Sequence, residues 1–122
     1  MQDPTREVQL ADTTTIIRPA VVSHRVRSVS TFEPGVEYGV EDGTALGRTP
    51  EAGIYLDHPS VSRHHAVFGV QDGALTITDV GSTNGTMVNE QRLTPQEPVT
   101  LSPGDTIQVG GSEEVQLRVE EA

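Results

Sequence analysis

Turn-forming residues interrupt this sequence every few positions from Glu33 to the C-terminus, and their spacing limits what the chain can fold into. Between the turns lie only short runs rich in Val, Ile and Thr, several of which alternate apolar and polar residues. No segment shows a helical period over the length of a helix. Short alternating runs separated by turns are typical of β-sandwiches. We therefore expect an all-β fold, a two-sheet antiparallel β-sandwich of about eleven short strands.

The alternation and the bounding turns define the expected strands. The first strand is ended by the turn tripeptide Glu33-Pro34-Gly35. The pair Asp72-Gly73 lies between two alternating apolar runs, which is a strong signal for a β-hairpin. The expected strands are residues 24–32, 36–40, 44–47, 54–56, 65–70, 74–80, 86–89, 92–93, 99–101, 106–109 and 115–119.

The N-terminal segment differs from the rest of the chain. Residues 1–20 show no sustained period and few core-forming residues, so we expect a disordered tail there, a folded domain over 21–119 and a short solvated end at 120–122. Three threonines stand in the run Asp12-Thr13-Thr14-Thr15-Ile16-Ile17-Arg18. This run is either a linker or stray edge strand, or else a kinase substrate phosphorylated at Thr13 or Thr14.

Composition excludes several classes of partner. The net charge is −10, without any lysine, so the basic face of a nucleic-acid binder is missing and an anionic membrane would repel this surface. Only 34% of residues are apolar and 3% aromatic, so Val, Leu and Ile must build the core. The N-terminus is unlike a secretory signal, and no apolar run is long enough for a transmembrane helix. We expect a cytoplasmic protein or the cytoplasmic part of a larger one.

Three polar signatures fall where strand patterns stop or start, and a sandwich can bring such loops to one end. They are Gly47-Arg48, Ser62-Arg63-His64-His65 and Gly81-Ser82-Thr83-Asn84-Gly85-Thr86. Arg48 carries a planar fork of donors that suits the oxygens of a phosphate. Ser62 and Thr83 supply hydroxyls, Asn84 supplies an amide, and the glycines let backbone N–H groups approach closely. The chemistry that these loops offer together is phosphate binding.

Two other chemistries use some of the same residue types. Ser62, His65 and Asp79 could form a hydrolase triad, but a serine three residues before its histidine has no default triad geometry. The loop after Asp79 also lacks the nucleophile elbow, so we expect no enzymatic activity. The residues available to a metal site are Asp57, His58, His64 and His65. Because adjacent strand residues point to opposite faces, we expect neither a metal nor a cofactor.

At the three signatures the chain resembles the forkhead-associated (FHA) domain, a family that binds phosphothreonine peptides. Ser62 lies 14 positions after Arg48 and Asn84 lies 22 positions after Ser62, and each interval holds the short strands that the FHA fold requires. The resemblance extends over roughly residues 24–119. Further matching stretches are Leu46-Gly47-Arg48, Ile54-Tyr55-Leu56-Asp57, Asp79-Val80-Gly81 and Leu101-Ser102-Pro103-Gly104-Asp105.

The resemblance implies a role for each signature residue. Arg48 and Ser62 would bind the phosphate, with help from Thr83 and Arg63, and Asn84 would hold the main chain of the peptide. The structural members of the motif would be Gly47, His65 and Gly85, of which the histidine braces a loop without touching ligand. The implied function is phosphothreonine-dependent recognition in Ser/Thr-kinase signalling. The alternative is a scaffold domain that binds proteins without using a phosphate.

The tail has a resemblance of its own. Residues 12–18 are similar to the N-terminal phosphorylation motif of small actinobacterial FHA regulators of 2-oxoglutarate metabolism. This similarity implies a Ser/Thr protein kinase as a partner. A hypothesis follows: a tail phosphorylated at Thr13 or Thr14 fills the phosphate site of its own chain or of a neighbouring copy, which switches partner binding off.

Overall fold

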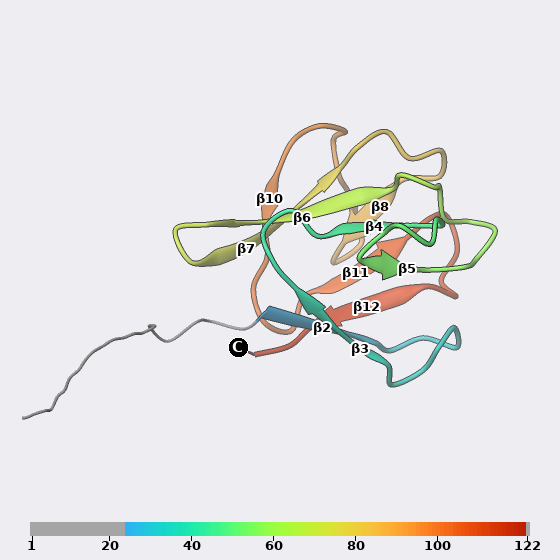
Figure 1. Cartoon of the computed structure of the whole chain (residues 1–122), viewed down its shortest axis with the longest axis horizontal. Coiled ribbons are helices and arrows are strands. Elements are labelled where there is room, and N and C mark those ends of the chain that lie inside the picture. The colour runs from blue at the N-terminus through green and yellow to red at the C-terminus, as the bar shows by residue number, and fades with distance from the viewer. Residues whose placement is uncertain (1–23, 122) are drawn as a thin grey trace, which may run out of the picture.

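The computed structural model describes residues 24–121, which form two β-sheets packed face to face (Figure 1). One sheet has the strand order β10 (Val99–Thr100), β7 (Ala74–Asp79), β6 (Ala66–Gln71), β4 (Ala45–Gly47) and β5 (Ile54–Tyr55). The other has the order β3 (Glu37–Val40), β2 (His24–Ser28), β12 (Gln116–Val119), β11 (Thr106–Val109), β8 (Thr86–Val88) and β9 (Gln91–Arg92). The predicted β-sandwich is confirmed, except that β4 and β5 pair in parallel. Within 24–121 no helix could cross a membrane.

The core lies between the sheets and is aliphatic, as the composition requires. Along β11 and β12 every second residue is buried, which places Ile107 and Leu117 inside and their neighbours outside. Phe68 is the aromatic residue at its centre and is fully buried. The longest ladder joins β6 to β7 through a two-residue loop in which Asp72 and Gly73 both have positive φ (52° and 81°). That is the type I′ geometry of the predicted Asp-Gly hairpin.

The first strand is shorter than predicted, because β2 ends at Ser28 instead of residue 32. The Ser28 hydroxyl donates a hydrogen bond to the carbonyl of Phe32 at 2.5 Å, and the Gly35 N–H donates to the carbonyl of Ser28 at 2.9 Å. A serine that bonds local backbone competes with the sheet ladder, so the chain turns early. The other ten strands differ from the prediction by at most one residue at either end.

The remaining expectations about domain limits stay predictions. The described strands run from His24 to Val119. The proposed tail over residues 1–20, with Thr13 and Thr14, lies outside the described residues.

A second tight turn carries an unfavourable residue. Asn89 and Glu90 join β8 to β9 with φ of 50° and 70°, again a type I′ turn, in which the second position strongly favours glycine. We expect Glu90→Gly to raise the free energy of unfolding by about 1 kcal/mol in urea denaturation. The control is Glu97→Gly, at an exposed loop residue outside the left-handed region, which should not stabilise. An unchanged or lower stability for Glu90→Gly would contradict this account of the turn.

Candidate functional site

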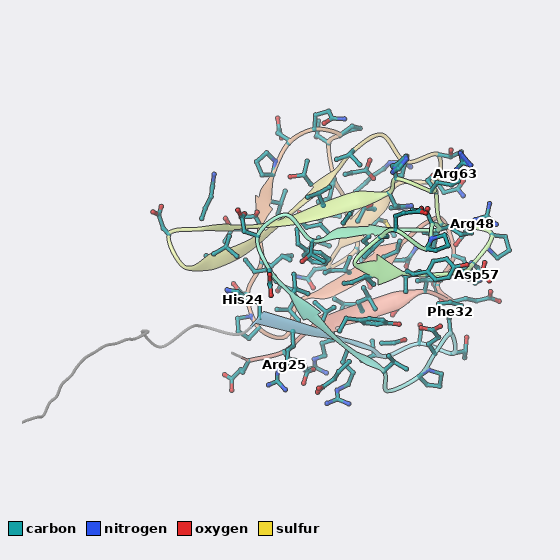
Figure 2. The ribbon with its side chains drawn as sticks, viewed as in Figure 1. His24, Arg25, Phe32, Arg48, Asp57 and Arg63 are labelled. Carbon is teal, nitrogen blue, oxygen red and sulfur yellow. The ribbon has the colours of Figure 1, made fainter. Side chains whose placement is uncertain are left out.

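Loops that follow β4, β5 and β7 meet at one end of the sandwich. Arg48 and Arg63 lie at this end, and His24 and Arg25 lie at the other (Figure 2). The loops enclose an open cavity of about 310 Å³, which we call the phosphate cavity. Its lining contains all five residues that the sequence assigned to ligand contact, together with three from the loop after β5. The lining residues are Arg48, Pro59, Ser60, Val61, Ser62, Arg63, Thr83 and Asn84.

Gly47 brings the first two loops into backbone contact. The Arg48 N–H donates to the carbonyl of Ser62 at 2.9 Å. A Cβ atom at position 47 would lie 1.9 Å from the carbonyl oxygen of Arg63, so no larger residue fits without moving the backbone. The absence of a side chain at Gly47 thereby allows Arg48 to lie beside Ser62.

His65 connects the second and third loops and is completely buried. Its Nδ1 accepts the N–H of Ser62 at 3.0 Å, so the ring proton resides on Nε2, which donates to the carbonyl of Gly85 at 3.0 Å. Burial lowers the pKa of His65, and the bond to Gly85 and the charge of Asp79 oppose this only in part. The imidazole is therefore a neutral brace between two loops.

Asp79 organises the third loop, a role that the sequence analysis did not assign to it. Its Oδ1 accepts the N–H groups of Gly81 at 2.8 Å and Ser82 at 2.9 Å. Its Oδ2 accepts the hydroxyls of Ser82 at 2.6 Å and Thr86 at 2.7 Å. Burial raises the pKa of Asp79, but the hydrogen bonds from Ser82, Thr86 and Gly81 outweigh it and leave the pKa below its usual value. An Asp two residues before Gly-Ser, as in Asp79-Val80-Gly81-Ser82, is the available sequence signal for such an aspartate-capped turn.

Ser62, Thr83 and Asn84 are tied to one another through the neighbouring backbone. The Thr83 N–H donates to Oγ of Ser62 at 2.9 Å, which leaves the serine proton able to point at a ligand. The amide nitrogen of Asn84 donates to the carbonyl of Ser60 at 3.0 Å and keeps a second proton and its oxygen. Gly85 has a φ of 88° whereas Asn84 is not left-handed, so this Asn-Gly pair is not a plain type I′ turn.

The two arginines of the phosphate cavity are exposed and lack a carboxylate within salt-bridge distance among residues 24–121. Arg25 and Arg27, on the opposite sheet, instead pair with Glu37. In a chain of net charge −10, two guanidinium groups without such partners at one cavity favour a bound anion.

The residues considered for a triad or a metal site make hydrogen bonds to other partners. Ser62 and His65 contact each other only through the serine N–H, and Asp79 bonds to neither of them. His58 accepts the Ser60 N–H at Nδ1 and lies 2.8 Å from Glu114 through Nε2. The part of the chain that the structure describes contains no group of three metal-ligating side chains.

Comparisons with known proteins identify the family and agree with the fold. The sequence model of the FHA domain matches residues 44–110. The oxoglutarate dehydrogenase inhibitor of Corynebacterium diphtheriae is 49% identical over 55% of this chain, which spans only 45% of that relative. An FHA domain from an Arabidopsis thaliana hypothetical protein superposes with a TM-score of 0.75 at 28% identity, covering 83% of this chain and 86% of that one. Mycobacterium tuberculosis EmbR, bound to a low-affinity phosphopeptide, gives 0.71 at 27% identity over 83% and 25%.

The neutral His65 predicts a pH dependence of stability. Its ordinary pKa is 6.5 and the folded value is lower, so at falling pH the unfolded chain takes up a proton that the folded chain refuses. We expect the urea midpoint to decrease as the pH is lowered from 7.5 to 5.5. Over this range the free energy of unfolding should change by at most about 1.4 kcal/mol per pH unit. Asp79 contributes outside this window, because its stabilisation is lost only below its ordinary pKa of 3.8.

Two variants isolate the histidine. His65→Gln should be less stable at pH 7.5 but lose the pH dependence, whereas the exposed His64→Gln should keep both. The same pH dependence in His65→Gln as in the unchanged chain would show that another group titrates.

Proposed function

Because this chain belongs to the forkhead-associated domain family, we propose that it binds phosphothreonine-containing segments of other proteins in Ser/Thr-kinase signalling, with residues 21–119 as the recognition domain. The observation that carries the proposal is the pair of exposed arginines beside Ser62, in a cavity braced by His65. Domains of this family are recognition modules, and we assign no catalytic step to it. We place its action in the cytoplasm, with nucleic acid and membranes excluded as direct partners by the acidic charge.

Five residues of the phosphate cavity have a chemical task in this proposal. Arg48 supplies a bidentate fork to two phosphate oxygens, and Ser62 donates its hydroxyl proton to a third. Thr83 adds a hydroxyl from the loop after β7, and Arg63, next to Ser62 in the loop after β5, adds a second positive charge. The free donor and acceptor of Asn84 pair with the main chain of an extended peptide. The hydrogen bonds from Thr83 to Ser62 and from Asn84 to Ser60 support these tasks, because they hold the side chains in fixed positions.

Removing Arg48 tests the proposal. Hydrogen bonds to charged groups contribute roughly 1.5–3 kcal/mol, so Arg48→Ala should weaken phosphothreonine peptide binding about ten- to a hundredfold in calorimetric titrations. Peptides of the same sequence that carry phosphoserine or unphosphorylated threonine are titrated for comparison. Arg118→Ala is the matched control, because that arginine is exposed on β12 of the other sheet. Equal binding of phosphorylated and unphosphorylated peptides would favour the phosphate-independent scaffold.

We further propose that the tail of the chain is a ligand for the phosphate cavity once a Ser/Thr kinase has phosphorylated Thr13 or Thr14. The support is the run of threonines after an acidic residue at 12–18 and the exposed cationic cavity. A phosphorylated tail would compete with outside partners by mass action and thereby reduce their apparent affinity. Occupation within one chain and occupation between two copies are both compatible with this proposal.

A peptide of residues 7–20 phosphorylated at Thr13 or Thr14 tests the tail. We expect at least one of the two to bind the full chain and to lose that binding in Arg48→Ala. The full chain is also phosphorylated by a kinase and titrated with a partner. A loss of partner binding that does not depend on protein concentration would indicate that the tail occupies the phosphate cavity of its own chain. Self-association would indicate that it occupies the cavity of another copy. If neither phosphopeptide binds while other phosphothreonine peptides do, the tail is not a ligand.

A further inference from the structure

A second cavity of about 160 Å³ shares one lining residue, Arg63, with the phosphate cavity. The two differ in character, since the second cavity is walled mainly by apolar side chains. Its walls include Ala45 on β4, Ala52 in the following loop and Val67 on β6, all of them half-buried. We call this feature the alanine cavity.

The alanine cavity exists because small residues stand where larger ones would fill the space. Ala45, Ala52 and Ala66 come from three separate segments, and each ends at its Cβ atom. Half-buried apolar walls left open to solvent are favourable surface for an apolar group from outside. The space has room for a single aliphatic side chain.

Polar groups stand around the apolar walls. Thr49, Glu51, Arg63 and His64 belong to the lining and are exposed or half-buried. The hydroxyl of Thr49 lowers the pKa of Glu51, and the nearby charges of Arg63 and His64 lower it further. Opposite charges thus lie close together around the cavity, so its surroundings favour neither a cation nor an anion and leave the apolar walls to select the occupant.

The geometry of an extended ligand connects the two cavities. In an extended chain, side chains two residues apart point the same way and stand about 7 Å apart. When a phosphothreonine occupies the phosphate cavity, the side chain two residues away in either direction therefore also faces the protein surface around that cavity. In the direction of Asn84 this surface is polar and includes Ser60. In the direction of Arg63 it includes the alanine cavity.

We propose that the alanine cavity selects an aliphatic side chain, such as Leu or Val, two residues from the phosphothreonine on the side of the phosphate away from Asn84. This inference rests on the proposed function and adds a specificity-determining contact to it. The residue of this protein that controls the selection is Ala52, because it lies in a surface loop where a larger side chain occupies the cavity without disturbing a strand.

Calorimetric titration of the full chain with matched phosphothreonine peptides tests the inference. One peptide carries Leu two residues before the phosphothreonine, a second carries Leu two residues after it, and a third carries Ala at both positions. Burying the additional carbons of one leucine should tighten binding about tenfold. We expect this gain at one of the two positions and not at the other, because only one side of the phosphate leads to the alanine cavity.

Filling the cavity supplies the matched comparison. Ala52→Phe should remove the preference for Leu and keep phosphate-dependent binding of the Ala peptide, whereas Ala74→Phe, at a half-buried alanine at the start of β7, should keep the preference. In NMR spectra of the unchanged chain, the backbone amide signals of Ala52 and Val67 should also shift more with the Leu peptide that binds more tightly than with the Ala peptide. This readout does not depend on any variant folding.

The outcomes separate the two proposals. Equal affinity for the Leu and Ala peptides, in a chain whose phosphothreonine binding still depends on Arg48, would overturn the alanine cavity and leave the proposed function in place. A Leu preference that survives Ala52→Phe in a folded variant would also overturn it. Loss of all phosphothreonine dependence would overturn the proposed function and this inference with it.

Discussion

The pair of hydrogen bonds made by the buried ring of His65 is the contact on which the candidate site depends. One ring nitrogen accepts the N–H of Ser62 and the other donates to the carbonyl of Gly85, so one side chain sets the distance between two loops that are 20 residues apart. The ring can make both bonds only while neutral, and burial keeps it so. The buried carboxylate of Asp79 holds the third loop in shape, because it accepts hydrogen bonds from backbone N–H groups and hydroxyl groups of that loop.

Much of this arrangement could be predicted from the sequence because its signals are local. The Asp72-Gly73 turn was predictable because a type I′ turn needs positive φ at both positions, and these residues tolerate it. The candidate site was predictable because its members come in three short runs next to strand ends. Once strands of a sandwich place those ends together, Arg48, Ser62 and Asn84 must converge.

Other features depend on contacts between distant residues and have no local signal. The parallel pairing of β4 with β5 follows from how the loop between them folds back, which alternation along either strand does not encode. The early end of β2 depends on the hydrogen bond that the Ser28 hydroxyl donates to the carbonyl of Phe32. The alanine cavity arises from small side chains on β4, the following loop and β6, and no pattern along any one of these segments indicates it.

The bond from the Thr83 N–H to the Ser62 hydroxyl oxygen joins the second and third loops within the protein itself, and it has a kinetic meaning. Loops already fixed in position lose little conformational freedom when a peptide arrives, so association proceeds without a slow rearrangement. Differences between good and poor peptides then appear mainly in how long each stays bound. A recognition module of this kind samples many phosphorylated segments quickly and discriminates among them by residence time.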